Sequence, residues 1–428
     1  EISSMRLQRT LPPSAAPIEW RDLLEGVVGL VRPQVTIQCL QAEFRSHFGV
    51  KHVWFVSSGK AALTLILRAL HTLSGRSQVV VPGYTCFSVP SAVVRAGLSV
   101  RLCDINPKTF DLDFLRLAEV TDSDVLCVLA THLLGIGVDV QRVIEMCHPK
   151  GIFVVEDVAQ AFGGERDGKP FGSLGDVSFL SFGRGKNITC GSGGAILTND
   201  DHIGEALARE YAQLPDEPLA GQIKNWLEVA VTQLLIKPSR FWFPAGLPFL
   251  KLGETKFYTD FPISRMDSVR GGLLRRWQKR LSRSTASRVD HAEQIRRVVP
   301  SHVQPVTSSG RGRSVYLRFP LLMRSKQAKD ALCRRSAEQG LGISALYPCA
   351  VKQIAELSGT LSSQQVPGST MIGERLVTLP THEFVSDGDL VRLRAALEMV
   401  QDEQCSEVKT SSEVPGAERR AQGLPRAH

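Results

Sequence analysis

Between about Val53 and Asn199 the sequence alternates short apolar runs with segments of helical periodicity, and this alternation constrains the fold more than any other feature. The runs are VWFV, QVVVPG, SVRLCDI, DVLCVLA, IFVVED, VSFLSF and GAILT. Amphipathic stretches lie between several of them, at residues 61–70, 88–96, 114–118 and 139–147. Continuous apolar strands separated by helices are typical of a mostly parallel sheet covered on both faces. The pattern predicts an α/β fold in which ligands bind where strands end.

The character of the chain changes after Asn199. An apolar, proline-broken insertion at about 213–253 is followed by a long basic helix over 264–299, whose arginine clusters we expect on a solvated face. A second strand and helix unit from Ser314, ending in a helix over 387–400, predicts a smaller C-terminal α/β domain. We expect an N-terminal arm with helices over 1–52, a large domain over 53–270, a long helix with the small domain over 271–403, and a disordered tail over 404–428.

Composition narrows the class of protein. Hydrophobic residues make up 43% and charged residues 22%, as in ordinary folded proteins. The formal net charge of +8 suits an anionic substrate or an anionic membrane surface and does not indicate nucleic acid. The nine cysteines contain no C-x-x-C pair, so we expect buried thiols of a reducing cytoplasm and no metal site. We find no segment of the signal-peptide type and no apolar stretch of about 20 residues that could span a membrane.

The first candidate ligand loop follows the first apolar run. It reads Ser57-Ser58-Gly59-Lys60 and leads directly into a helix. Free backbone N–H groups at the start of a helix, with glycine allowing close approach, form a phosphate-binding site. The same pattern is also an ordinary helix N-cap, and the loop alone does not distinguish the two.

The second loop ends a buried run in two acids, Glu156 and Asp157, with Gln160 three residues after the second. A carboxylate at the end of a buried strand needs a strong partner, because leaving it unpaired is costly. The protonated ring nitrogen of a cofactor would be such a partner, and so would an arginine in a structural ion pair. This stretch favours neither.

The third loop places Lys186 between a strand-like run and the Gly191-Ser192-Gly193-Gly194 turn. A partly desolvated lysine has a lowered pKa and can attack a carbonyl to form a Schiff base. A lysine that merely covers a glycine turn is the ordinary alternative. The order of the three loops, phosphate site, acid and lysine, matches the three anchors of pyridoxal phosphate.

These loops resemble the PLP-dependent sugar aminotransferases of the DegT/DnrJ/StrS type, which have the fold-type I architecture. The resemblance covers about Val53 to Asn199 and resumes near Arg265 and at LPTHEFVSDGDL. It is carried by SSGKAAL, THLLGIGVDV, VVEDVAQAFGGERDGKPFGSLGDVSFLSF and GKNITCGSGGAILTND. The pattern E-D-x-A-Q-A-x-G followed by G-x-x-G-D-x-x-x-x-S-F-x-x-x-K-N is highly specific.

The resemblance implies a role for each matching residue. Lys186 would bind the cofactor aldehyde and later carry the transferred proton, Asp157 would keep the pyridine nitrogen protonated, and Gln160 would bond the phenolic oxygen. His132 would lie near the substrate, although a histidine packed at a strand end is an equal alternative. The remaining cofactor-binding residues would be Ser58, Gly59, Lys60, Ala61, Cys86 and Ser181.

The sequence departs from the family pattern at four positions. Lys60 stands where Thr or Ser is usual, Cys86 where an aromatic ring stacks on the cofactor, and Ser192 where an acid is common. Ile263 occupies the position of an asparagine that the family donates to the phosphate of the partner subunit. These positions concern the cofactor cup and the choice of substrate.

The resemblance implies a homodimeric, cytoplasmic aminotransferase that moves an amino group from glutamate or another amino acid to a nucleotide-linked keto-sugar, for polysaccharide or glycoside biosynthesis. The segment 226–253 would pack on the dimer partner, or would contact a membrane and serve a lipid-linked or other membrane-proximal carbonyl substrate. A dehydratase is disfavoured, because the family's dehydratases carry histidine in place of the lysine. A non-catalytic regulator is a further alternative, and the intact Lys186, Asp157 and Gln160 argue against it.

Overall fold

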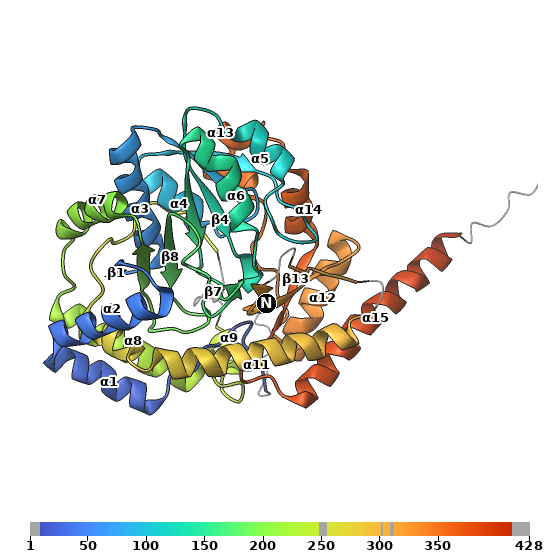
Figure 1. Cartoon of the computed structure of the whole chain (residues 1–428). Coiled ribbons are helices and arrows are strands. Elements are labelled where there is room, and N and C mark those ends of the chain that lie inside the picture. The colour runs from blue at the N-terminus through green and yellow to red at the C-terminus, as the bar shows by residue number, and fades with distance from the viewer. Residues whose placement is uncertain (1–8, 248–254, 301–302, 309–311, 413–428) are drawn as a thin grey trace, which may run out of the picture.

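The computed structural model describes residues 9–247, 255–300, 303–308 and 312–412, with backbone alone for 400–412. Its centre is a seven-stranded sheet in the order β1-β9-β8-β5-β4-β2-β3 (Figure 1). The strands are β1 (His52–Val56), β2 (Gln78–Pro82), β3 (Ser99–Cys103), β4 (Val125–Thr131), β5 (Phe153–Asp157), β8 (Val177–Ser181) and β9 (Gly194–Thr198). Each predicted apolar run forms one of them. Neighbouring strands from β3 to β8 are parallel and β9 is antiparallel to both β8 and β1, which confirms the mostly parallel sheet.

Helices cover both faces of this sheet because its strands are apolar on both sides. Val79 and Val81 of β2 pack in one core cluster, whereas Val80 between them packs in another. The helices of the first face are α3 (Gly59–Ser74), α4 (Ser88–Arg95) and α7 (Asp201–Ala212). Those of the second face are α2 (Pro33–Phe48), α5 (Phe114–Val120), α6 (Val140–Cys147) and α11 (Trp277–Val298). The sheet is therefore the middle of three layers.

A helical corner lies beside β1 and is built on close backbone contact. Its helices are α1 (Trp20–Val31), α8 (Leu219–Leu235), α9 (Trp242–Ala245) and α10 (Ser268–Leu274). A Cβ at Gly29 would lie 2.1 Å from the Ser268 carbonyl oxygen, and one at Gly272 would lie 2.1 Å from the Glu25 oxygen. Only glycine allows α1 and α10 to cross this closely.

The long basic helix predicted over 264–299 is two helices, α10 and α11, with the break at Arg275 and Arg276. The expectation of a solvated face for the arginine clusters is wrong for Arg280, which is 3% exposed. Arg288, which stands outside these clusters, is fully buried as well. Backbone carbonyls accept their hydrogens: Arg280 bonds the oxygens of Leu273 and Thr189, and Arg288 bonds those of Leu317 and Ala15. A planar guanidinium can satisfy several carbonyls at once, which is why burial is tolerated.

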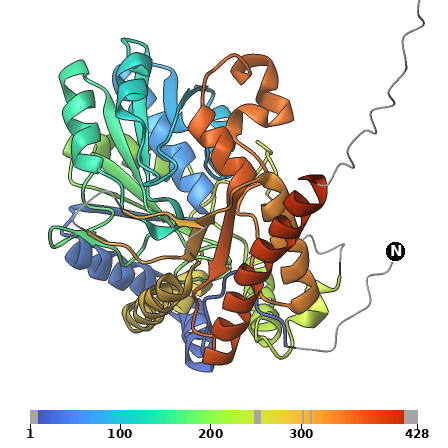
Figure 2. The ribbon, with the colours of Figure 1, turned by 90° about the vertical axis from the view of Figure 1, so that its right-hand side faces the viewer.

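The C-terminal part forms a small sheet of β10 (Gln304–Pro305), β12 (Arg318–Leu322) and β13 (Leu376–Pro380), with β13 absent from the sequence-based prediction. Its helices are α12 (Lys326–Gln339), α13 (Ser358–Leu361), α14 (Pro367–Arg375) and α15 (Asp387–Ser412), and α15 lies along this part of the molecule (Figure 2). A third, short sheet contains β6 (Glu165–Arg166), β7 (Lys169–Pro170) and β11 (Gly312–Arg313). The 3-10 turns are η1 (Leu133–Gly135), η2 (His148–Lys150), η4 (Val351–Gln353) and η5 (Ala355–Leu357).

Helix α15 continues to Ser412, past the predicted end near Val400. No proline or glycine stands between Val400 and Ser412, so nothing in the local sequence stops the helix. The rest of the predicted tail, 413–428, lies outside the described residues. One core cluster joins Val128 of β4 to Phe319 of β12 and Leu397 of α15, and the domain boundaries remain predictions.

Of the helices that the structure describes, none combines the length and the apolar character that crossing a bilayer requires.

Candidate active site

A cleft of about 210 Å³, open to solvent, lies where β5 and β8 end and α3 begins. The predicted residues that line it are Ser58, Gly59, Lys60, Cys86, Asp157, Gln160, Ser181 and Lys186. Residues separated by more than 120 positions in the sequence therefore meet in one place. Ala61 is buried directly beneath, and His132 does not line the cleft.

The loop before α3 caps the helix and also leaves backbone donors at its start. The Ser58 hydroxyl oxygen accepts a hydrogen bond from the Ala61 N–H at 3.1 Å, which is ordinary capping. The N–H groups of Gly59 and Lys60 precede the first intrahelical bond and remain available. A Cβ at Gly59 would lie 2.9 Å from the Ser181 Cβ, so glycine is required for the helix start to approach this serine. Backbone donors and a hydroxyl thus converge on one point of the cleft.

Lys60 adds a positive charge to the same place. Its ammonium hydrogen-bonds the Tyr258 hydroxyl and lies 3.6 Å from the centre of the Tyr258 ring and 4.6 Å from that of Phe261. Such cation–π contacts hold a lysine without neutralising it. The ammonium therefore remains able to pair with an anion bound at the helix start.

Asp157 is 5% exposed and forms no ion pair with a described arginine or lysine. Its carboxylate accepts hydrogen bonds from the Ala159 N–H at 3.0 Å and, more weakly, from the Thr131 hydroxyl at 3.4 Å. Burial raises the pKa of Asp157, and these donors together with Lys186 oppose the rise. The structural ion pair considered as one alternative is therefore absent from the described residues. A buried carboxylate in this setting fits a cationic ligand group.

Lys186 faces Asp157 from the loop between β8 and β9. Burial lowers the pKa of its ammonium, while the Cys86 thiol and Asp157 act in the opposite direction. Helix α11 fixes the loop: the Arg280 guanidinium bonds the Thr189 carbonyl at 2.6 Å, and the Ser284 hydroxyl bonds the Asn187 carbonyl at 2.8 Å. Helix α11 therefore holds the backbone that carries Lys186, and burial favours the neutral, nucleophilic form of its amine.

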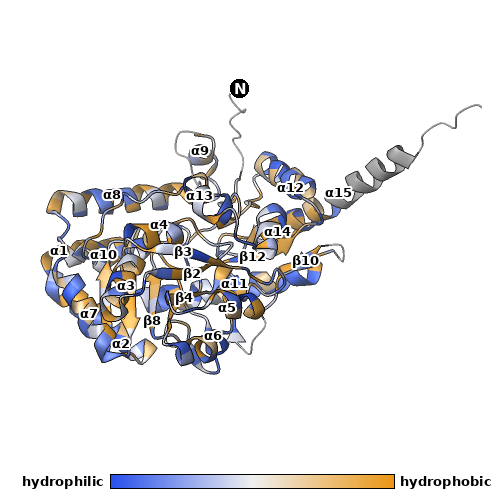
Figure 3. Cartoon of the chain, turned by 90° about the horizontal axis from the view of Figure 1, so that it is seen from above, coloured by the Kyte–Doolittle hydropathy of each residue, from blue (hydrophilic) through white to orange (hydrophobic). Residues whose placement is uncertain are grey.

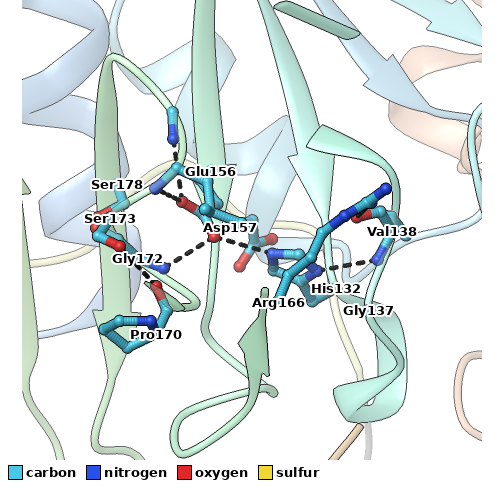
Figure 4. Close-up of polar contacts among 12 residues, drawn as sticks. His132, Gly137, Val138, Glu156, Asp157, Arg166, Pro170, Gly172, Ser173 and Ser178 are labelled. Atoms are coloured by element: carbon cyan, nitrogen blue, oxygen red, sulfur yellow. Dashed lines mark hydrogen bonds and ion pairs between the residues drawn. The ribbon is translucent and has the colours of Figure 1, made fainter. Parts of the chain in front are cut away.

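His132 lies away from the cleft, where its side chain is buried and hydrogen-bonded. Its Nε2 bonds the Glu156 Oε1 at 2.9 Å and its Nδ1 accepts the Val138 N–H at 3.1 Å (Figure 4). Its ring stacks on that of Phe171. Both ring nitrogens are used and the side chain is fully buried. The alternative of a histidine packed at a strand end describes this arrangement.

Glu156 has a structural role on the opposite side of β5 from Asp157. Besides His132 it accepts the N–H groups of Gly172, Leu174 and Gly175, at 2.7, 2.9 and 3.1 Å. Successive residues of a strand point to opposite faces, so the two adjacent acids are separated by the sheet itself. One carboxylate is saturated with donors and the other is left for a ligand.

Tyr347 lines the cleft and was not found from the sequence. It follows the small-domain segment ISAL and accepts a hydrogen bond from the Gln160 amide at 2.5 Å. A tyrosine 187 positions from its partner, in a loop without a motif, carries no signal in a single sequence. It brings an aromatic ring to the cleft that Cys86 also lines, and Cys86 is where this chain lacks the aromatic residue of the family pattern.

The other departures from the family pattern have local explanations. The Ser192 hydroxyl donates to the Ser57 carbonyl at 2.6 Å and so ties the glycine turn to the loop before α3. A Cβ at Gly194 would lie 2.6 Å from the Ser58 oxygen, so the turn must pass this loop as bare backbone. Ile263 packs against the core cluster that contains α3.

A family model for the DegT/DnrJ/EryC1/StrS aminotransferase family matches residues 31–214 and 261–398, and the chain belongs to this family. GDP-perosamine synthase of Caulobacter vibrioides is 36% identical over 160 residues, which are 37% of this chain and 43% of that protein. The match thus spans less than half of this curated relative.

Two solved structures share the fold over nearly their whole length. Helicobacter pylori PseC, an aminotransferase of pseudoaminic acid biosynthesis, has a TM-score of 0.74 at 15% identity, over 92% of this chain and 100% of that one. The PLP form of the sugar aminotransferase Spr1654 from Streptococcus pneumoniae has a TM-score of 0.69 at 19% identity, over 92% and 99% of the two chains. These similarities confirm the fold-type I architecture.

Proposed function

We propose that the chain is a PLP-dependent aminotransferase that moves an amino group from an amino acid, glutamate in the first instance, to a nucleotide-linked keto-sugar for polysaccharide or glycoside biosynthesis. The observation that carries the proposal is the single cleft in which Lys186 faces the unpaired Asp157 beside the start of α3. Membership of an aminotransferase family supports it, and so does the similarity to GDP-perosamine synthase and to an aminotransferase of pseudoaminic acid biosynthesis.

The residues of the cleft fit pyridoxal phosphate. The N–H groups of Gly59 and Lys60, the Ser181 hydroxyl and the Lys60 ammonium would hold its phosphate. Asp157 would hold the proton on its ring nitrogen. The bound cofactor supplies an electron sink for the substrate carbon.

Lys186 would move the proton of the transfer. Because burial lowers the pKa of its ammonium, its Nζ can take a proton from a substrate carbon and return it. Lys186 would thus serve the proton transfer, and the donors around the phosphate would hold the cofactor in position. Among the described residues, Asp157 is the one carboxyl group that lines the cleft, and it would hold the ring nitrogen. The proton taken from the substrate carbon would therefore stay on Lys186 Nζ until it is returned.

The first experiment tests cofactor attachment. The wild-type protein should bind pyridoxal phosphate, show a visible absorption band, and yield a borohydride-reduced label that maps to Lys186. Lys186→Ala should lose the reducible band, whereas the control Lys60→Ala should keep it with weaker cofactor affinity. A label on another lysine would overturn the assignment of the site.

The second experiment identifies the two substrates. Glutamate should abolish the visible band of the loaded enzyme, and one of a panel of keto-sugar nucleotides should restore it. A band that responds to no amino donor would favour the regulator alternative.

We also propose that the protein is a cytoplasmic homodimer, with a second copy covering the exposed apolar side of α8. Leu219, Ile223, Leu227, Val231 and Leu234 recur at helical spacing on this side and are 45 to 61% exposed. Helices α8 and α9 lie together at one edge of the molecule (Figure 3). The segment 226–253, which we expected to pack on the dimer partner, contributes residues 226–247 to this edge. Residues 248–253 lie outside the described part of the chain. The unpaired cysteines support a reducing compartment.

A further inference from the structure

Tyr347 is held in the cleft by its backbone and by its ring. Its loop begins at Ser344, whose hydroxyl accepts from Arg318 at 3.0 Å. The backbone N–H of Tyr347 donates to the Tyr84 hydroxyl at 3.1 Å, and that hydroxyl donates back to the Tyr347 carbonyl at 3.3 Å. The two rings lie 5.5 Å apart. The phenol is thus fixed in position before any ligand binds.

Gln160 fixes the orientation of the Tyr347 hydroxyl. The Gln160 Oε1 accepts the Leu134 N–H at 2.7 Å, so the amide oxygen must face Leu134 and the amide nitrogen must face Tyr347. The Nε2 then donates to the Tyr347 oxygen at 2.5 Å. A hydroxyl that accepts from one side directs its own hydrogen elsewhere.

The hydrogen of the Tyr347 hydroxyl has no acceptor among the described residues, although the side chain is only 5% exposed. Burial raises the pKa of this phenol well above its ordinary value, so the group stays a donor at neutral pH. A buried donor without an acceptor is costly, and the cleft that it lines is where an acceptor can enter.

We infer, on the basis of the proposed function, that the Tyr347 hydroxyl donates a hydrogen bond to the phenolic oxygen of bound pyridoxal phosphate, the contact that the family resemblance gives to Gln160. Gln160 is then a positioning residue for Tyr347. The contact also links the small domain directly to the cofactor site.

The test is the pH titration of the visible band of the loaded protein. The negative charge on the phenolic oxygen stabilises a proton on the neighbouring Lys186 nitrogen. A hydrogen-bond donor to that oxygen weakens this stabilisation and so lowers the pKa that the midpoint measures. Tyr347→Phe keeps the ring and removes the donor, so the midpoint should rise by about half a pH unit or more. The matched control is Tyr316→Phe. Tyr316 is also buried, but it does not line the cleft, and its hydroxyl accepts a hydrogen bond of 2.6 Å from Arg296. This variant should leave the midpoint unchanged.

Gln160→Leu should raise the midpoint by a smaller amount, because the hydroxyl remains but loses its fixed direction. It also provides the measurement should Tyr347→Phe fail to fold. In the double variant Gln160→Leu with Tyr347→Phe the shifts should not add, since both act through one hydrogen. A wild-type band with unchanged midpoints in both single variants would overturn the inference alone. A wild-type protein that takes up no pyridoxal phosphate would overturn the proposed function and this inference together.

Discussion

At the scale of single residues, Glu156 and Asp157 are adjacent on β5 but have different surroundings. The sequence placed Glu156 and Asp157 at the end of a buried run and left open whether an arginine or a ligand neutralises them. The strand geometry resolves this, since Glu156 meets His132 and three N–H groups whereas Asp157 meets the cleft. The local pattern could locate the site. It could not show that His132 supports Glu156, because that depends on the fold of residues 132–138.

Asp157→Asn should separate cofactor binding from catalysis. The amide keeps the shape of the side chain but cannot hold a ring-nitrogen proton by charge, so the rate of the glutamate half-reaction should fall on the order of 100-fold or more. Stopped-flow loss of the visible band measures this rate. The control Glu156→Gln should mainly lower Tm, and an Asp157→Asn enzyme within a few-fold of the wild-type rate would contradict the role of Asp157.

His382 should make the protein acid-sensitive. Burial lowers its pKa to about 3, and its Nε2 bonds the Pro12 carbonyl at 2.8 Å. A folded-state pKa below the ordinary value of 6.5 means that the unfolded chain binds the extra proton. The contribution to the free energy of unfolding is therefore full above about pH 6.5 and is lost as the pH falls toward 3.

Denaturant unfolding at several pH values measures this loss. His382→Gln retains a donor for the Pro12 carbonyl but does not titrate, so its stability should fall less steeply between pH 6.5 and 3. Parallel curves for the two proteins would show that the titration of His382 is not the cause.

At the scale of elements, the packing of α10 against α1 explains why the helical periodicity of residues 264–299 does not give a single helix. The residues from 264 to 299 look like one amphipathic helix, but α10 and α11 separate where α10 must lie backbone to backbone against α1. A single sequence shows Gly271 and Gly272 as weak points in a helix and does not show the crossing helix that requires them. The burial of Arg280 and Arg288 could not be predicted for the same reason. The carbonyls that accept their hydrogen bonds belong to other segments of the chain, which the sequence of α11 does not reveal.

Gly272→Ala should destabilise the α1–α10 crossing. The added Cβ would meet the Glu25 backbone oxygen at 2.1 Å, which cannot move without shifting a helix, so the expected cost is about 2 kcal/mol or more. Thermal unfolding checks this. Gly359→Ala in α13 is the matched control, since its Cβ meets nothing within 4 Å and should leave Tm unchanged or slightly higher. Equal effects would contradict the packing argument.

At the scale of the whole molecule, the sequence predicted the seven strands of the central sheet and their mostly parallel arrangement, whereas the order of these strands came only from the structure. Continuous apolar runs identify buried strands but do not reveal neighbours. The pairing of β1 with β9 joins residues 138 to 146 positions apart, and the contact of Tyr347 with Gln160 spans 187 positions. Such contacts depend on topology, on which a single sequence carries little information.

The apolar side of α8 should control assembly. Leu227→Asp combined with Val231→Asp should convert a dimer to a monomer in light scattering, because the change puts two charges into an apolar interface. Leu115→Asp on α5, where Leu115 is 80% exposed, is the control and should leave the mass unchanged. If the wild type is instead a monomer that floats with anionic vesicles, a lipid surface and not a second copy covers α8.

The pairing of β1 with β9 also sets an order of events during folding. His52 pairs with Thr198 and Val56 with Gly194, so this edge of the sheet cannot close until residue 198 has been synthesised. Contacts of such long sequence separation form slowly. The loop at Ser58 follows β1 and packs on Gly194, so the proposed phosphate site is completed by the same late pairing. Uptake of the cofactor during refolding should therefore coincide with or follow closure of this edge, and the visible band of the bound cofactor would report that the edge has closed.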